Sequence, residues 1–255
     1  MKLKLTKSNY FTKKNTYISS SKLSTFLKDK YLYKRKYIDW EPQEKTDSLI
    51  IGSAVDTLLT GTLAKYNKEF VLVDRRSSKE TADKRTQITA TMWDKINGII
   101  LSVQRQSIWA DLKQKKWKKQ TILADDTLGI CGMLDFLTVN GDHAIIVDLK
   151  TSNTIDPKKY YYHCWDYNYF MQAAFYTTLV KANYPEVRRV DFYHFAVEKD
   201  ADELYNCALF QFDKDIIAHE VDRMKAGLLQ LRQEKEFKPL DVGWKDKIII
   251  SNLLP

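Results

Sequence analysis

The sequence has few cysteines, and their scarcity excludes several kinds of site. Only three occur among 255 residues, at Cys131, Cys164 and Cys207, and none forms a CxxC pair. Structural zinc sites use closely spaced cysteine and histidine pairs, and a disulfide framework needs an even number of cysteines. We therefore expect no zinc ribbon, iron-sulfur cluster or disulfide framework, and we interpret the cysteines as small buried apolar residues.

Long apolar runs are absent as well. No segment has the run of about 20 apolar residues that crosses a bilayer, and the amino terminus, MKLKLTKSNYFTKKN, has no apolar stretch like that of a signal peptide. We therefore expect a cytoplasmic protein, in a bacterial or phage-infected cell, with no membrane partner. The pattern GxxxxGK followed by Ser or Thr is also missing, which excludes a fused helicase motor.

The composition is that of a globular protein with a basic surplus. Hydrophobic residues make up 44% and charged residues 29%, and 41 Lys and Arg against 33 Asp and Glu give a net charge of +8. A positive surplus favours anionic partners, either nucleic acid or a lipid surface. We expect a single domain over 1–255, with a mainly helical part over 1–119, an α/β core over 120–236 and a tail over 237–255.

The pattern of apolar residues predicts the order of the elements. Helices are expected over 16–37, over 47–59 with a stop at Gly61, and over most of 79–119, where the buried stripe is Trp93, Ile96, Ile100 and Val103. Strands are then expected over 121–124, 128–139 and 143–151, followed by a helix over 167–182, strands over 190–197 and 204–212, and a helix over 213–236. This order predicts a mixed α/β core.

A hairpin predicted around 140–141 brings three polar residues together. Asn-Gly at this position is a strong hairpin signal. If these two residues form the loop, Asp135 faces Ile146, and a four-residue loop instead places Asp135 opposite Asp148. In both cases Asp135, Asp148 and Lys150 lie on one face of the sheet, with backbones within roughly 8 Å, because side chains alternate along a strand. A three-residue loop without a bulge would break this arrangement.

The chemistry of these residues indicates a metal site. Asp135 and Asp148 lie in apolar runs, where a carboxylate is costly unless it is paired or bound to a cation. Mg²⁺ is typically held by one or two carboxylates together with water and phosphate oxygens. Lys150 can neutralise charge on a phosphate, or orient and deprotonate an attacking water. The alternative is a structural salt bridge between Lys150 and one aspartate, with the other capping a turn.

These motifs resemble a known family. The segments Gly132-Met133-Leu134-Asp135 and Val147-Asp148-Leu149-Lys150-Thr151 resemble the G-x-x-D and D-x-K-T core of the RecB/RecE-like branch of the PD-(D/E)xK nucleases. The opening segment over 18–37, with Ser21 and Arg35, is similar to the first helix of that branch. Farther along the chain, Gln172 and Tyr176 match its Q-x-x-x-Y helix.

The resemblance implies a restriction-endonuclease-like fold: a mixed central sheet flanked by helices, with a helical amino-terminal elaboration. It also implies hydrolysis of DNA with Mg²⁺ or Mn²⁺, held by Asp135, Asp148 and the backbone carbonyl of Leu149, while Lys150 is catalytic. The resemblance further implies that the site and the DNA backbone are supported by Gln172, Tyr176, Ser21, Arg35 and Gln120.

The sequence departs from the family pattern at three places. The family's histidine is Asp56 here, which we expect to bind metal through oxygen or to accept a hydrogen bond from Lys150. Many members have glutamate where this chain has Gln120, and this leaves fewer carboxylates for a second metal. The Cys-Pro of members with an iron-sulfur cluster is replaced by Asp29-Lys30, so we expect no cluster.

The resemblance is closest to phage-type recombination exonucleases, which implies digestion of duplex DNA ends, a single-strand annealing protein as partner, and a ring-shaped homo-oligomer. A repair or restriction-type endonuclease on the same core is an alternative. A non-cleaving DNA-binding module with a decayed site is another. Binding to a membrane surface ranks last, because the basic amino terminus lacks a long amphipathic helix.

Overall fold

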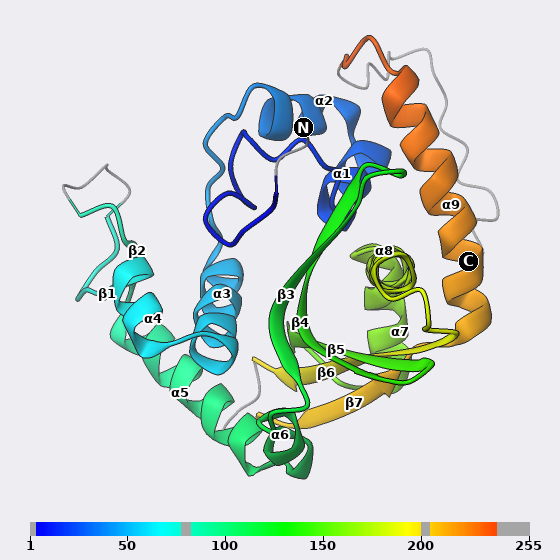
Figure 1. The fold of residues 1–255 in the computed structure, drawn as a ribbon. Coiled ribbons are helices and arrows are strands. Elements are labelled where there is room, and N and C mark those ends of the chain that lie inside the picture. Colours follow the sequence, from blue (N-terminus) through cyan, green and yellow to red (C-terminus); the bar gives the residue numbers. More distant parts are fainter. Residues whose placement is uncertain (1–3, 78–82, 200–204, 239–255) are drawn as a thin grey trace.

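A five-stranded mixed sheet forms the centre of the protein (Figure 1). The structure is a computed structural model that describes residues 4–77, 83–199 and 205–238. In spatial order the strands are β3 (Lys118–Asp125), β4 (Ile130–Asn140), β5 (His143–Ser152), β6 (Arg189–Glu198) and β7 (Cys207–Gln211). Only β5 and β6 pair in parallel within this sheet. The predicted mixed central sheet is therefore confirmed.

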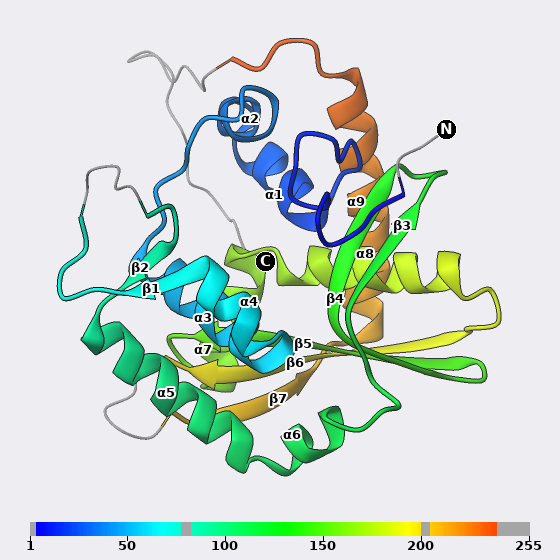
Figure 2. The same cartoon turned by 60° about the vertical axis from the view of Figure 1, so that its left-hand side comes forward.

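Helices cover both faces of the sheet (Figures 1 and 2). On one face lie α1 (Ser20–Lys28), α7 (Pro157–Asp166), α8 (Tyr169–Asn183) and α9 (Lys214–Gln233). On the other lie α3 (Asp47–Thr60), α4 (Leu63–Glu69), α5 (Ala90–Arg105) and α6 (Ser107–Leu112). A separate parallel pair is formed by β1 (Phe70–Leu72) and β2 (Thr86–Ile88). Each face of the central sheet thus has its own hydrophobic core.

The single helix predicted over 16–37 is wrong. The chain forms α1, then α2 (Lys30–Tyr33), then the π-helix η1 (Lys34–Ile38). The break lies at Asp29, whose extended backbone ends α1 and whose side chain accepts a hydrogen bond from the backbone N–H of Leu32. Aspartate favours such a capping position because its side chain satisfies a helix N–H that has no partner within the helix.

The prediction for 79–119 holds in part. Residues 79–82 lie outside the described ranges, and β2 and the beginning of β3 occupy the two ends of the interval, with α5 and α6 between them. On α5 the fully buried residues are Met92, Ile96, Ile99 and Val103, while Trp93 and Ile100 are only partly buried. The helix α7, which was not predicted, begins at Pro157 after the capping residue Asp156.

The β4–β5 hairpin has the register that the four-residue loop predicts, although the turn itself contains two residues. Asn140 pairs with His143, so the two turn residues are Gly141 and Asp142 rather than Asn140 and Gly141. Gly141 has a φ of 58°, which glycine adopts without steric cost. The ladder ends at the pair of Phe136 and Val147, and the same register carried one residue further places Asp135 opposite Asp148.

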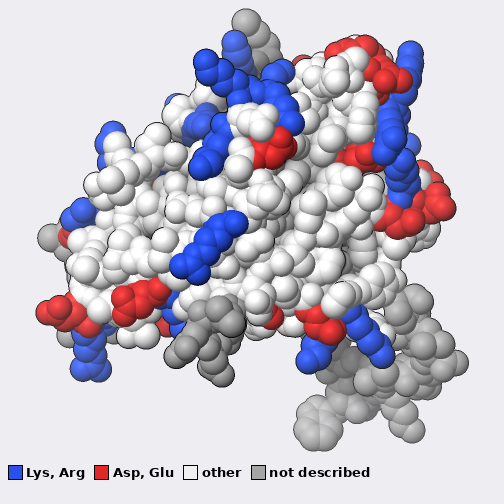
Figure 3. All heavy atoms as spheres, turned by 90° about the horizontal axis from the view of Figure 1, so that it is seen from below, with Lys and Arg blue, Asp and Glu red and all other residues white. Residues whose placement is uncertain are grey.

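The face seen from below in Figure 1 is mostly uncharged, and its charged side chains gather mainly along the edges (Figure 3). In the described part of the chain, no helix is long and apolar enough to cross a membrane.

Cys131 and Cys164 are buried, as predicted, whereas Cys207 is only partly buried.

Candidate active site

Neighbouring strands bring Asp135, Asp148 and Lys150 together. Asp135 on β4 accepts a hydrogen bond through Oδ2 from the backbone N–H of Leu149, at 3.0 Å. On β5 the ammonium of Lys150 forms an ion pair with Oδ2 of Asp148. The Asp148 side chain is 3% exposed and that of Lys150 is 17% exposed. The structure therefore places the three predicted residues in one partly enclosed cluster.

Helix α8 holds this cluster from one side. The side-chain nitrogen of Gln172 donates to Oδ1 of Asp148 at 3.0 Å and lies 3.1 Å from the hydroxyl of Tyr176. That hydroxyl donates in turn to the backbone carbonyl of Met133 on β4, at 3.0 Å. Residues four apart meet on one helix face, so a single face of α8 fixes the Asp148 carboxylate and the neighbouring strand.

Helix α3 and strand β3 close the cluster from the other side. The side-chain nitrogen of Gln120 lies 3.0 Å from Oδ1 of Asp135, 3.0 Å from Oγ1 of Thr60 and 3.4 Å from Oδ1 of Asp56. An amide nitrogen has only two hydrogens for these three acceptors. Gln120 also has a φ of 49°, a left-handed conformation that is uncommon outside glycine. The amide thus bridges two carboxylates from a strained position.

The cluster is short of positive charge. Burial, followed by repulsion from Asp148 and Asp56, raises the pKa of Asp135 well above its ordinary value. Burial likewise raises the pKa of Asp56. For Lys150 burial opposes the charged form, but the interactions with Asp148, Tyr169 and Asp135 together outweigh it and raise the pKa, so this residue is an ammonium. One ammonium therefore faces three carboxyl groups, which is a setting that favours a bound cation.

The residues fit a hard divalent cation that keeps part of its water. Among the described residues, no three His, Cys, Asp or Glu side chains are grouped so that they could hold a metal alone. Mg²⁺ uses one or two carboxylates and completes its coordination with water, carbonyl and phosphate oxygens. Asp135 and Asp148 supply the carboxylates, and the predicted carbonyl ligand at Leu149 follows Asp148 directly on β5. The donor set consists of oxygen alone, as Mg²⁺ and Mn²⁺ prefer.

A buried histidine behind Asp148 was not predicted. His194 on β6 pairs with Asp148 in the parallel register and is fully buried. Its Nδ1 lies 2.7 Å from the hydroxyl of Tyr160, and its Nε2 lies 4.0 Å from Oδ2 of Asp148. Burial, and then the charge of Lys150, lowers the pKa of His194 well below its ordinary value, so the ring is neutral. The contact between His194 and Asp148 follows from the parallel pairing of β5 with β6. The periodicity of the sequence does not reveal this pairing.

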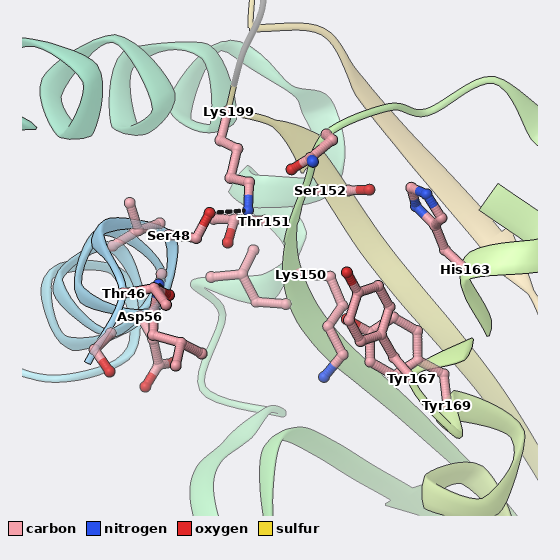
Figure 4. A pocket seen from close by; sticks show the side chains of 16 residues that line it. Thr46, Ser48, Asp56, Lys150, Thr151, Ser152, His163, Tyr167, Tyr169 and Lys199 are labelled. Atoms are coloured by element: carbon pink, nitrogen blue, oxygen red, sulfur yellow. Dashed lines mark hydrogen bonds between the residues drawn. The ribbon is translucent and has the colours of Figure 1, made fainter. Parts of the chain in front are cut away.

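Two cavities open beside the cluster, and Ser53 and Asp56 line both of them. The first, of about 600 Å³, lies next to Lys150 between α3 and the start of α8 (Figure 4). The second, of about 630 Å³, is reached past Gln120. Its lining includes the cationic side chains of Lys45, Lys65, Lys68 and Arg85. The first cavity therefore reaches the cluster at Lys150 and Asp56, and the second reaches it at Gln120 and Asp56.

Two predicted supporting residues have only local contacts. Ser21 is exposed on α1, and its hydroxyl lies 3.0 Å from that of Ser19. Arg35 is exposed on η1 and forms an ion pair with Glu41 at 2.6 Å. None of these contacts involves the carboxylate cluster, so the roles of Ser21 and Arg35 in binding DNA stay predictions.

Solved structures include proteins of similar fold. A protein from Eubacterium rectale named "Putative exonuclease" has a TM-score of 0.67 and 18% identity, over 90% of this chain and 86% of that one. A phage-related exonuclease from Haemophilus somnus has 13% identity over 85% of this chain and 95% of that one, but its TM-score of 0.34 is too low to support an argument. No curated protein matches the chain.

The family comparison agrees with the geometry of the cluster. Residues 19–243 match the model of a family described as "PDDEXK-like domain of unknown function (DUF3799)". The matched range includes every residue of the carboxylate cluster, together with α8 and the two strands β4 and β5. The predicted likeness to the PD-(D/E)xK proteins is thereby confirmed, and this chain belongs to the PDDEXK-like domain family DUF3799.

Proposed function

We propose that the protein is a metal-dependent deoxyribonuclease that hydrolyses phosphodiester bonds at the ends of duplex DNA. The observation that carries this proposal is the grouping of Asp135, Asp148 and Lys150 on adjacent strands, beside cavities open to solvent. Membership of a PDDEXK-like family supports the nuclease. The name of the Eubacterium rectale relative supports the choice of an exonuclease.

Each residue of the cluster has a role in this proposal. Asp135, Asp148 and the carbonyl of Leu149 would hold Mg²⁺ or Mn²⁺, which supplies positive charge at the phosphate and lowers the pKa of a bound water. Lys150 carries its own charge to the edge of the cavity and stabilises the negative charge that develops on the phosphate. Gln172 keeps Asp148 oriented through Oδ1, which is separate from the oxygen that pairs with Lys150.

Cleavage of linear and closed circular DNA separates the proposal from its alternatives. Purified protein is incubated with end-labelled linear duplex and with closed circles, in Mg²⁺, Mn²⁺ or EDTA. The proposal predicts metal-dependent loss of the linear form, with the circles intact. Cutting of circles would instead support a repair or restriction-type endonuclease. Binding of both forms without cutting would support a non-cleaving DNA-binding module.

A further inference from the structure

We propose that the cavity beside Lys150 binds an unpaired nucleobase of the DNA strand by stacking it against Tyr167. This inference rests on the proposed function, and it specifies the state of the substrate: a strand end whose last base is out of the duplex. The cavity has about 600 Å³, within the range of small-molecule sites, which is roughly 300–1,000 Å³. The side chains that line the cavity indicate which ligand it can bind.

One wall of the cavity is aromatic. Tyr167 is 60% exposed, and its ring stacks on that of Tyr169 with centroids 5.6 Å apart and planes 27° apart. The ring of His163 meets Tyr167 edge-on at 5.9 Å. Tyr169 in turn lies 5.0 Å from the ammonium of Lys150. The aromatic wall therefore extends from solvent to the residue proposed to be catalytic (Figure 4).

The chain holds the two tyrosines in this position through a buried polar residue. Asn168, which separates them, has left-handed backbone angles, φ 54° and ψ 41°, and is 8% exposed. Its side-chain amide donates to the hydroxyl of Ser24 at 2.8 Å and accepts from Arg223 at 3.3 Å. An exposed stack of rings on a fixed turn, instead of a mobile loop, is a preorganised surface for a flat ligand.

The opposite wall, from α3, combines the apolar Leu49 and Val55 with polar side chains such as Ser53, and the floor is polar. Leu49 on α3 is 62% exposed at the cavity. Gly52 lets α3 approach β5 closely, because a Cβ there would lie 3.1 Å from Oγ1 of Thr151. The floor carries Thr151, whose hydroxyl group can donate or accept hydrogen bonds, and Ser152, whose hydroxyl is bonded to the backbone of Thr154. A flat ring with a polar edge, next to a cation that suits phosphate, is the chemistry of a nucleotide.

Occupation of the cavity requires an open base pair. A base inside a duplex is already stacked and paired, so an enzyme that places it in a pocket must first draw it out, and an unpaired base lowers that cost. Stacking on an aromatic ring tolerates every base, because each base has a π-face. We therefore expect a preference for frayed or mismatched ends over fully paired ends, with little dependence on which base is terminal.

Fluorescence of 2-aminopurine tests the cavity without catalysis. The probe is placed at the terminal nucleotide of a duplex whose end is either mismatched or paired, and binding to the full chain is measured in EDTA. We compare Tyr167→Leu with Tyr167→Phe, which keeps the ring. The matched control is Tyr162→Leu, because Tyr162 is 49% exposed on α7 but does not line the cavity.

Wild-type protein and Tyr167→Phe should quench the probe at the mismatched end. Tyr167→Leu should bind that end roughly tenfold more weakly, since stacking on one ring contributes about 1–3 kcal/mol. The control should bind as wild type does. Equal binding by Tyr167→Leu and wild type, or an equal loss in the Tyr162→Leu control, would overturn the proposal.

Cleavage assays separate the failure of this inference from the failure of the nuclease. Wild-type protein that cuts no DNA in Mg²⁺ or Mn²⁺, yet quenches the probe in a Tyr167-dependent way, would contradict the nuclease and leave the base site standing. Conversely, Tyr167→Leu that cuts mismatched ends as fast as wild type does would contradict the base site and leave the nuclease standing.

Discussion

At the scale of single residues, the cluster contains more than a structural salt bridge. The alternative drawn from the sequence was a pair between Lys150 and one aspartate, with the other aspartate capping a turn. The Lys150–Asp148 pair does exist, but Asp135 lies within β4 and bonds to Leu149 and Gln120. A salt bridge alone would not explain why Asp135 and Asp56, two partly buried carboxyl groups with raised pKa values, lie beside it.

The first prediction concerns metal binding by the carboxylates. Calorimetric titration of wild-type protein with Mn²⁺ should give saturable binding. Asp148→Asn should weaken that binding by roughly tenfold or more, a free-energy difference of about 1.4 kcal/mol, because the substitution removes one of the two charged ligands. The substitution Asp213→Asn is a suitable control, since Asp213 caps α9 away from the cluster. Wild-type affinity in Asp148→Asn would contradict the site.

The second prediction concerns Gln120, where the family often has glutamate. Gln120→Glu adds a carboxyl group within 3.4 Å of Asp56 and Asp135, so without metal it should lower the melting temperature through repulsion. Added Mn²⁺ should stabilise this variant more than it stabilises wild type, because binding to the folded state shifts the unfolding equilibrium. The measurement is thermal unfolding in EDTA and in Mn²⁺, and an equal shift for both proteins would count against the prediction.

At the scale of elements, the parallel pairing of β5 with β6 positions the site. The side chain of Asp191 on β6 connects the first residues of these two strands. Its carboxylate lies 2.8 Å from Nε2 of His143 on β5 and 2.6 Å from the guanidinium of Arg189. The carboxylate itself is only 3% exposed. The same pairing, continued along β5, places His194 beside Asp148, so the register at one end fixes the contacts at the other.

The third prediction is that the contacts of Asp191 with His143 and Arg189 make the stability of the fold depend on pH. Burial opposes the charge of Asp191, but hydrogen bonds from Arg189 and His143 outweigh it and lower the pKa. An aspartate whose pKa is lowered in the folded state stabilises the fold at pH values above its ordinary pKa of about 3.9. This contribution is lost as the pH falls through the folded-state pKa. Asp191→Asn should therefore lower the free energy of unfolding by about 1–3 kcal/mol at pH 7. The difference should shrink as the pH falls below about 4.

Urea unfolding of wild type and Asp191→Asn over a pH series from 7 to 3 measures this difference. A gap in unfolding free energy that stays constant down to pH 3 would show that the charge of Asp191 is not the cause. Asp142→Asn provides a control, because Asp142 is exposed in the β4–β5 turn.

The elements also show what periodicity can and cannot predict. Helix α3 and the strands of the sheet follow from the sequence because each is an apolar segment bounded by turn residues such as Gly61 and Gly141. The break at Asp29 and the helix α7 do not follow from periodicity. Capping chemistry indicates both, since Asp29 caps α2 and the Asp156-Pro157 pair is typical of a helix start. The turn at 140–143 was placed one residue early, yet the parity of Asp135 and Asp148 survived.

At the scale of the whole molecule, the site depends on segments that are distant in sequence. Asp56 comes from α3, Gln120 from β3, and Tyr167 from the turn between α7 and α8. A single sequence predicts the Asp135, Asp148 and Lys150 group because one hairpin holds it. The two cavities and the histidine behind Asp148 require the packing of both layers on the sheet, which no local pattern encodes.

The positive charge of the molecule is consistent with a path for phosphate past the cluster. The net charge is +8, and the broad face in Figure 3 carries little charge at its centre. By contrast, the cavity beyond Gln120 is lined by five cationic side chains, those of Lys45, Lys65, Lys68, Lys84 and Arg85, and Lys150 borders the other cavity. The two cavities meet at Ser53 and Asp56, which line both of them.

The most direct test of the central claim is cleavage by wild type and by Lys150→Ala, assayed as nucleotides released from a linear, end-labelled duplex in Mg²⁺ and in EDTA. The account predicts release by wild type in Mg²⁺ alone. It predicts a rate at least roughly 100-fold lower for Lys150→Ala, because a charge that stabilises the transition state is lost. Lys118→Ala, which removes an exposed lysine bonded to Tyr184, should leave the rate unchanged. Release in EDTA, or near-normal release by Lys150→Ala, would contradict the account.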